Sequence, residues 1–291
     1  MAEPSSDPFV THRSLLFTVA YEMLGSAADA EDVLQESWLR WADADRTEVR
    51  DPRAYLVRTV TRQSLNRLRT LSRRREDYVG QWLPEPLLTS PDVAEDVELA
   101  ESVSIALLTV LETLGPTERA VFVLREVFDV PYGEIAEAVG KSAATVRQIA
   151  RRARDHVAAR QPRVKVARTE QQAVVERFLG AMRTGDLQGL MEVMAPDVVM
   201  IADGGGHVAA ALLPLHGADV VAKLLATAKT KVTELAATPV WFNASPSARL
   251  DFDGEPAALS VVVSGDRITH IYVIRNPGKL TRIDEETQLT R

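Results

Sequence analysis

The sequence of 291 residues contains no cysteine, which excludes a disulfide scaffold, a thiolate metal site and a cysteine nucleophile, and is compatible with a reducing compartment. It also has no apolar run near the roughly 20 residues that span a bilayer. Its first residues, MAEPSSDPFV, have neither the basic start nor the apolar core of a signal peptide. These absences predict a soluble cytoplasmic protein with no membrane partner, and the length suggests two or three domains.

Charge is unevenly distributed along the chain. The formal net charge is −7, from 34 Lys and Arg against 41 Asp and Glu. Two basic blocks cover residues 46–75 and 141–165, and an acidic segment with three prolines, 81–102, lies between them. Sign asymmetry of this kind is more informative than the sum. We expect two surfaces suited to nucleic acid, with weak unaided DNA binding because the acidic segments oppose docking on phosphates.

Hydrophobic periodicity divides the chain into helical and mixed parts. Residues 9–71 and 93–159 follow a helical period, whereas helices near 170–182 and 187–194 are followed by strand-like runs. The strand-like runs are 197–201, 257–263 and 268–275, with a hairpin turn expected at 264–266. The predicted fold is two all-α domains followed by an α+β domain. The expected bounds are 8–78 for the first helical domain, 79–97 for a linker, 98–162 for the second helical domain and 168–285 for the α+β domain.

Residues 131–156 have the pattern of a helix-turn-helix. Ala136, Gly140 and Val146 stand where a small contact residue, a turn glycine and a buried branched residue are needed. The second helix then presents a basic face, on which arginines supply phosphate contacts and the residues near its start can reach base edges. The candidates are Ser142, Thr145, Arg147, Gln148, Arg151 and Arg152. The alternative is an ordinary helical hairpin with a solvated basic face.

Two helices precede the linker. In the helix expected at 29–42, Trp38 and Trp41 fall on the apolar face and are expected in the core, whereas acids lie on the opposite face, where capping and solvation would equally explain them. The helix expected at 52–75 has a buried stripe of Leu56, Val60, Leu65 and Leu68. Another face carries Arg58, Arg62, Asn66 and Arg69, with Arg67 nearby, and suits a phosphate backbone and an exposed base. A fully solvated arginine face is the alternative, which mutual repulsion of ten arginines disfavours.

The three helical segments resemble regions 2 and 4 of extracytoplasmic-function (ECF) sigma factors of the sigma-70 family. They are DAEDVLQESWLRWA, DPRAYLVRTVTRQSLNRLRTLSRRR and LGPTERAVFVLREVFDVPYGEIAEAVGKSAATVRQIARRAR, and they cover roughly residues 8–160. The resemblance implies a promoter-specific initiation subunit that binds core RNA polymerase and promoter DNA, with no catalytic residue, cofactor or metal. It places Asp32, Gln35, Glu36 and Leu39 on the polymerase clamp, Arg58, Arg62, Asn66, Arg67 and Arg69 on the −10 element, and Ser142 to Arg152 on the −35 element.

Three further motifs, WLPEPL at 82–87, DGGGH at 203–207 and NPGKL at 276–280, resemble those of the subgroup with a fused SnoaL-like domain. The resemblance implies that this domain regulates the sigma factor in cis, in place of a separate membrane anti-sigma factor. We expect the linker to dock near the DGGGH loop and to hold a closed, inactive arrangement. His207 departs from the subgroup, where lysine is expected. The implied interdomain residues are Trp82, Leu83, Pro84, Asp203, Gly204, Gly205, Gly206, His207, Asn276 and Pro277.

Two other functions remain open at this point. One is a helix-turn-helix regulator that acts without polymerase. The other is a small-molecule-binding or isomerase-like activity in the C-terminal domain, with a general base among Asp203, His207, His216 and His270. No paired carboxylate or metal-ligand spacing supports the catalytic alternative.

Overall fold

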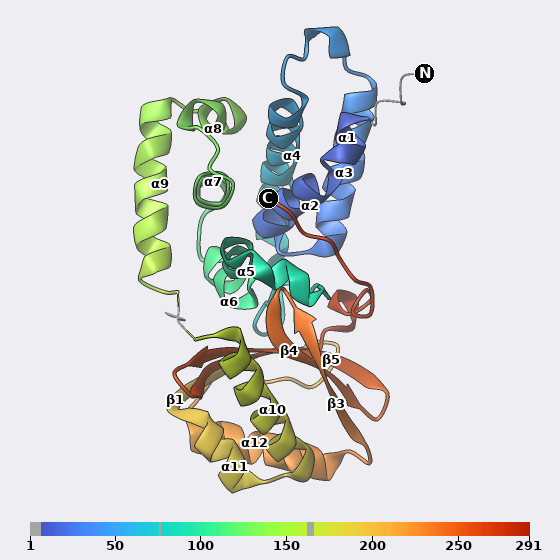
Figure 1. Ribbon diagram of the computed structural model, residues 1–291, viewed down its shortest axis with the longest axis vertical. Helices are drawn as coiled ribbons and strands as arrows, with labels where there is room; N and C mark the ends of the chain where they lie inside the picture. The colour runs from blue at the N-terminus through green and yellow to red at the C-terminus, as the bar shows by residue number, and fades with distance from the viewer. Residues whose placement is uncertain (1–6, 76, 162–165) are drawn as a thin grey trace.

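The computed structural model describes residues 7–75, 77–161 and 166–291. In these residues, two groups of helices lie on one side of a six-stranded sheet, and three further helices lie on its other side (Figure 1). None of the helices in the described ranges is both long and apolar enough to cross a membrane.

The first helical domain has a buried core between its long helices. Gly25, at φ +68°, ends one helix in the left-handed conformation, and the Ser26 hydroxyl accepts a hydrogen bond from the Asp29 amide to begin the next. The predicted stripe of Leu56, Val60, Leu65 and Leu68 is buried, which confirms that prediction. The elements are α1 (Pro8–Thr11), α2 (Arg13–Leu24), α3 (Ala27–Ala42), the 3₁₀ turn η1 (Arg46–Glu48) and α4 (Pro52–Arg75).

The two tryptophans of α3 differ in burial. Trp41 is 1% exposed, as predicted for the core, whereas Trp38 is 37% exposed and meets the Phe9 ring edge-on at a centroid distance of 5.2 Å. The prediction was therefore wrong for Trp38. Its position at the margin of the apolar face lets α1 cover part of the ring and leaves the rest to solvent.

The second helical domain contains the expected helix-turn-helix. Gly140, at φ +67°, closes its first helix, and the Ser142 hydroxyl accepts from the Thr145 amide at 3.2 Å to begin the second. Val146 and Val157 are buried along the predicted stripe. The elements are η2 (Pro91–Glu95), α5 (Val97–Val103), α6 (Ile105–Leu111), α7 (Pro116–Phe122), the π-helical turn η3 (Val123–Val127), α8 (Tyr132–Val139) and α9 (Ala143–Ala158).

The C-terminal domain combines helices with a six-stranded sheet, which confirms the predicted α+β class. Its strands follow the order β2-β1-β6-β5-β4-β3, with β1 and β6 parallel and the other neighbours antiparallel. The three predicted strands correspond to β1, β5 and β6, and Gly265, at φ +61°, forms the predicted hairpin turn. The elements are α10 (Arg168–Thr184), α11 (Leu187–Val193), β1 (Met194–Asp203), β2 (Leu215–His216), α12 (Ala218–Lys231), β3 (Leu235–Phe242), β4 (Ser245–Phe252), β5 (Glu255–Ser264), β6 (Arg267–Ile274) and η4 (Pro277–Lys279).

The domains are packed against one another. One apolar cluster runs through both helical domains and takes in Ala244, from the β3–β4 turn, and Leu289, near the end of the chain. A second cluster joins Leu83 of the linker to Ile105 of α6 and to the sheet. Figure 1 shows the final segment returning to α2 beside the first helical domain. The linker therefore lies between two domains and contacts both.

Candidate nucleic-acid and interdomain interfaces

The recognition helix α9 presents its candidate residues to solvent. Ser142, Thr145, Arg147, Gln148, Arg151 and Arg152 are all exposed. The hydroxyls of Ser142 and Thr145 lie 2.8 Å apart and cap the helix, so they are partly committed to local structure. The Arg147 guanidinium lies 5.6 Å from the Tyr132 ring centroid, and Arg152 is 4.0 Å from Glu118. Arg147, Gln148 and Arg151, which were predicted to read bases, are therefore open to solvent.

The arginine face of α4 contacts the helix-turn-helix. The Arg58 guanidinium forms an ion pair with the Glu137 carboxylate of α8 at 2.8 Å. One turn further along α4, Arg62 donates to the backbone carbonyl of the same Glu137, also at 2.8 Å. Arg58 and Arg62, two of the five residues expected at the −10 element, therefore bind the helix-turn-helix domain, which is expected at the −35 element.

The other three residues expected at the −10 element, Asn66, Arg67 and Arg69, lie nearer the C-terminal end of α4. The Arg67 guanidinium binds Asp29 at 2.7 Å and Asp32 at 2.6 Å, and its hydrogen bond to Asp29 raises the pKa of Arg67. Asn66 and Arg69 are exposed and contact each other weakly at 3.5 Å. Asp32, expected on the polymerase face, therefore pairs with an arginine expected on DNA.

The face of α3 expected to meet polymerase is open to solvent. Gln35, Glu36 and Leu39 are exposed, and Leu39 is 58% exposed although it is fully apolar. The half-exposed Trp38 adjoins them along the helix. Exposed leucine beside exposed aromatic surface suits a protein partner.

Asp203 forms the centre of a buried hydrogen-bond network at the end of β1. Its carboxylate accepts from the Tyr78 hydroxyl at 2.6 Å, the Leu83 amide at 2.8 Å and the Gly205 amide at 3.0 Å, and pairs with the Lys279 ammonium at 2.7 Å. The Asp203 side chain is fully buried. We call Tyr78, Leu83, Asp203 and Lys279 the Asp203 clasp. It ties the linker to β1 and η4, which are far apart in sequence.

Further contacts of Lys279, and a hydrogen bond from Asn276, support the Asp203 clasp. The Lys279 ammonium also donates to the Leu83 carbonyl at 2.5 Å and lies 3.9 Å from the centroid of the Trp82 ring. The Asn276 amide donates to the Tyr78 hydroxyl at 2.7 Å. Burial raises the pKa of Tyr78, and the hydrogen bond to Asp203 raises it further, so the phenol stays protonated as a donor. Tyr78 and Lys279 were not among the predicted interdomain residues, although Lys279 lies within the NPGKL motif and Tyr78 lies four residues before WLPEPL.

The triple glycine allows the close approach that the clasp requires. Gly205 has φ +60°, and a Cβ there would overlap the Asn276 amide. Gly206 has φ +75° and faces Val79, and a Cβ on Gly204 would overlap the Val208 carbonyl. His207, by contrast, is exposed. The three glycines therefore contribute through their backbone. His207, which stands where lysine was expected, makes no hydrogen bond within the Asp203 clasp.

The opposite side of the linker contacts the first helical domain. The Glu85 carboxylate accepts from the Ala27 amide at 2.8 Å and from the Ser26 hydroxyl at 3.2 Å, at the positive end of α3. Burial raises the pKa of Glu85, and the amide donors oppose that shift. Trp82 packs on Gly25, where a Cβ would come within 2.7 Å of the ring. The linker therefore holds the first helical domain and the C-terminal domain together.

A turn that was not predicted forms a third junction. Asn243, at φ +53°, begins the β3–β4 turn and is fully buried. Its amide nitrogen donates to the Tyr21 hydroxyl at 2.6 Å and the Val103 carbonyl at 2.8 Å, and its oxygen accepts from the Leu87 amide at 3.0 Å. One side chain thus joins α2, α5 and the linker. An asparagine between two strand-forming runs was the sequence signal for this turn.

A buried polar network lies between α2 and α7. Arg119 donates to the Glu22 carbonyl at 3.0 Å and forms an ion pair with Glu112. The Ser102 hydroxyl donates to the Glu22 carboxylate at 2.8 Å. Burial raises the pKa of Glu22 to about 8, against the opposing effects of Ser102 and Arg119. This network crosses from the first helical domain to the second and was not predicted.

The candidate catalytic residues are separated. The Asp203 carboxylate is occupied by the clasp, and His207 and His216 are exposed. His270 lies in β6, where burial lowers its pKa. The described residues contain no group of three His, Cys, Asp or Glu that would hold a metal ion. These four residues therefore do not come together as a general acid–base site.

The chain has two helical domains, the second of which contains a helix-turn-helix, followed by an α+β domain. The two helical domains have the organisation of a sigma-70-type protein. The family models for sigma-70 region 2 and region 4 match residues 9–74 and 104–157. The ECF RNA polymerase sigma factor SigJ of Mycobacterium tuberculosis (strain ATCC 25618 / H37Rv) is 36% identical over 94% of this chain and 92% of its own. The probable ECF RNA polymerase sigma factor SigI of Mycobacterium tuberculosis (strain CDC 1551 / Oshkosh) is 33% identical over 98% and 97%.

A solved structure agrees with these relatives. The crystal structure of Mycobacterium tuberculosis extracytoplasmic function sigma factor SigJ matches with a TM-score of 0.77 and 34% identity, covering 94% of this chain and 97% of that one. The chain belongs to the ECF sigma factors, and the match to the SigJ structure extends along nearly the whole chain, including its α+β domain. Its function is promoter-specific transcription initiation with RNA polymerase, and it is not an enzyme.

Proposed function

We propose that the arrangement described above is the silent state of this sigma factor, in which the C-terminal domain restrains promoter recognition in cis. The linker, the Asp203 clasp and the Asn243 turn together take the place of a separate anti-sigma protein. The chain acts in the cytoplasm, where core polymerase opens it. The observation that carries the proposal is that Arg58 and Arg62 are held by Glu137 of the helix-turn-helix.

Specific roles follow from exposure. Gln35, Glu36 and Leu39 are solvent-exposed, so we assign first contact with core polymerase to them. Arg58, Arg62, Asn66, Arg67 and Arg69 engage the −10 element after opening. Ser142, Thr145, Arg147, Gln148, Arg151 and Arg152 engage the −35 element.

Energetics support a restraint that is firm at the clasp and weak between the DNA-binding regions. The Arg58–Glu137 pair is partly exposed, with the Glu137 side chain at 62%, and pairs of this kind are worth about 0.2–1 kcal/mol. The pair between Asp203 and Lys279 is buried, and removing one partner of such a pair costs about 3–5 kcal/mol. Opening therefore separates the α4–α8 contact readily, whereas release of the linker needs a competing partner.

The test is a run-off transcription assay with purified core polymerase and a promoter that the wild-type chain uses. Asp203→Asn keeps the shape but leaves Lys279 without its charge partner, so we expect higher initiation at limiting polymerase. Asp197→Asn, an exposed position on the same strand, is the matched control and should leave initiation unchanged. Equal or lower initiation by a folded Asp203→Asn chain would refute restraint by the clasp.

A further inference from the structure

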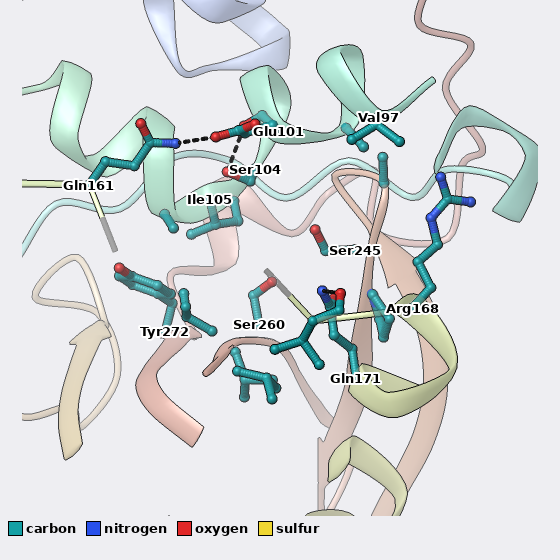
Figure 2. Close-up of a pocket in the computed structure, with 18 of the residues that line it drawn as sticks. Val97, Glu101, Ser104, Ile105, Gln161, Arg168, Gln171, Ser245, Ser260 and Tyr272 are labelled. Atoms are coloured by element: carbon teal, nitrogen blue, oxygen red, sulfur yellow. Dashed lines mark hydrogen bonds between the residues drawn. The ribbon is translucent and has the colours of Figure 1, made fainter. Parts of the chain in front are cut away.

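A cavity lies between the second helical domain and the C-terminal domain, away from the Asp203 clasp. Its volume is about 480 Å³, within the roughly 300–1,000 Å³ of small-molecule sites. Figure 2 shows its walls: α5 and α6 with Glu101, Ser104 and Ile105 on one side, and strand residues Ser260 and Tyr272 on the other. The start of α10 closes a third side. Two domains are therefore needed to form it.

The lining is mostly apolar. Val97, Ala100, Ile105 and Ala106 contribute from the helices, and Val262 contributes from β5. An apolar wall of this kind favours a ligand body that displaces poorly ordered water.

Four of the polar side chains at the margin form hydrogen bonds within the protein. The Glu101 carboxylate accepts from the Gln161 amide at 2.9 Å, and the Gln171 amide donates to the Val166 carbonyl at 3.0 Å. The Ser104 hydroxyl donates to the Glu101 carbonyl at 2.8 Å. The charged side chains in the described lining are Glu101 and Arg168, one of each sign, so their formal charges cancel and the lining does not favour an ionic ligand.

Three residues on the sheet side of the cavity carry hydroxyls: Ser245, Ser260 and Tyr272. Tyr272 is 4% exposed, and its hydroxyl makes no hydrogen bond to any described residue. Ser245 makes only a long contact of 3.4 Å to the Asn243 carbonyl, and Ser260 shares one contact of 3.0 Å with Ser247. Burial raises the pKa of Tyr272 above its usual range, so the phenol remains a donor. Neutral donors beside an apolar wall suit a carbonyl or hydroxyl oxygen.

We infer that this cavity binds a neutral small molecule with an apolar body and a hydrogen-bonding oxygen, and that this ligand acts as a co-inhibitor. The inhibitory part rests on the proposed function, because separation of the domains would remove one wall. A ligand that binds only the closed arrangement at 100 times its Kd raises the closed-to-open ratio about 100-fold. Core polymerase and ligand then oppose each other, and each weakens binding of the other by the same factor.

Prodan, 6-propionyl-2-(dimethylamino)naphthalene, is a suitable probe, since it is neutral and apolar and its carbonyl accepts hydrogen bonds. Titrated into the full chain, it should show saturable, blue-shifted fluorescence. Ala106→Trp fills the cavity and should abolish that signal, whereas Ala236→Trp, at an exposed position on β3, should retain it. Tyr272→Phe should weaken prodan binding about fivefold.

Folding of each variant is checked by thermal unfolding, and Ala106→Leu, a smaller filler, should give a partial loss if Ala106→Trp fails to fold. Absence of saturable binding to the wild type, or unchanged binding by Ala106→Trp or Ala106→Leu, overturns the site. Added core polymerase should raise the Kd of prodan; an unchanged Kd overturns the co-inhibitor role. Failure of the proposed function appears elsewhere, as unchanged transcription by Asp203→Asn.

Discussion

Raising the pH from 6 to 8 should destabilise the wild-type chain relative to Glu22→Gln. In the folded chain the pKa of Glu22 is about 8, against an ordinary value of 4.5, because the carboxyl is fully buried. Between these values the unfolded chain releases a proton that the folded chain keeps, so the free energy of unfolding falls as pH rises. At about 1.4 kcal/mol per pKa unit, and allowing for saturation near pH 8, the fall between pH 6 and 8 is about 2 kcal/mol.

Urea unfolding at several pH values measures this difference, since Gln cannot ionise and other titrating groups are common to both chains. Arg119, the charged group facing Glu22, does not contribute a slope in this window: burial lowers its pKa only to about 9. Glu36→Gln, on the exposed side of α3, controls for the loss of one carboxylate. A difference between wild type and Glu22→Gln that stays constant from pH 6 to 8 would show that burial does not hold the proton on Glu22.

Three further variants test the interfaces. Gly205→Ala should lower the free energy of unfolding by about 1–3 kcal/mol, because the left-handed backbone strains alanine and the methyl group meets Asn276; urea unfolding measures it. Arg147→Ala combined with Arg151→Ala should reduce −35-dependent transcription at least tenfold, since a good base contact is worth about 1–3 kcal/mol. Leu39→Asp should weaken binding to core polymerase at least tenfold in a direct binding assay, because burying leucine contributes about 1.5–3 kcal/mol.

Matched controls separate these effects from general damage. Gly265→Ala has nearly the same φ, +61°, but open space around the new methyl group, so a cost equal to that of Gly205→Ala would argue against the Asn276 contact. Arg160→Ala removes an exposed arginine just beyond α9, and a loss of −35 use as large as that of the double variant would indicate nonspecific charge. Leu213→Asp changes a leucine that is 71% exposed on the C-terminal domain and should leave core binding intact.

Local sequence patterns were sufficient to predict the main helices and turns of the two helical domains. The α4 stripe and the turn at Gly140 depend on neighbours three or four residues apart, which periodicity and a left-handed glycine specify directly. Strands β3 and β4 and helix α12 were missed because their apolar residues do not follow a clear period. Trp38 was assigned to the core because a helical face marks the direction of a side chain but not how far the neighbouring helix extends.

The sequence predicted where the interdomain site lies, but it did not predict all of the residues that form it. The motifs at 82–87, 203–207 and 276–280 do meet, as the expected docking of the linker requires. The roles of Tyr78, Lys279 and Asn243 could not be found in this way, since each binds a partner more than 100 residues away along the chain. Such contacts are fixed by how whole domains pack.

The arginine-rich face of α4 has acidic partners that the local sequence did not reveal. Scarcity of nearby acids suggested that the row required an external anion, yet Glu137, Asp29 and Asp32 supply internal ones from other helices. Each exposed pair is worth about 0.2–1 kcal/mol, whereas every phosphate contact adds affinity through counterion release. Acids that weakly occupy Arg58 and Arg67 can therefore screen the row from nonspecific DNA and still yield to a promoter held in place by polymerase. Under the proposed function the linker, rather than the α4–α8 pair, then sets the barrier to DNA binding, because the exposed pair is weak and the linker contacts at Asp203 are buried.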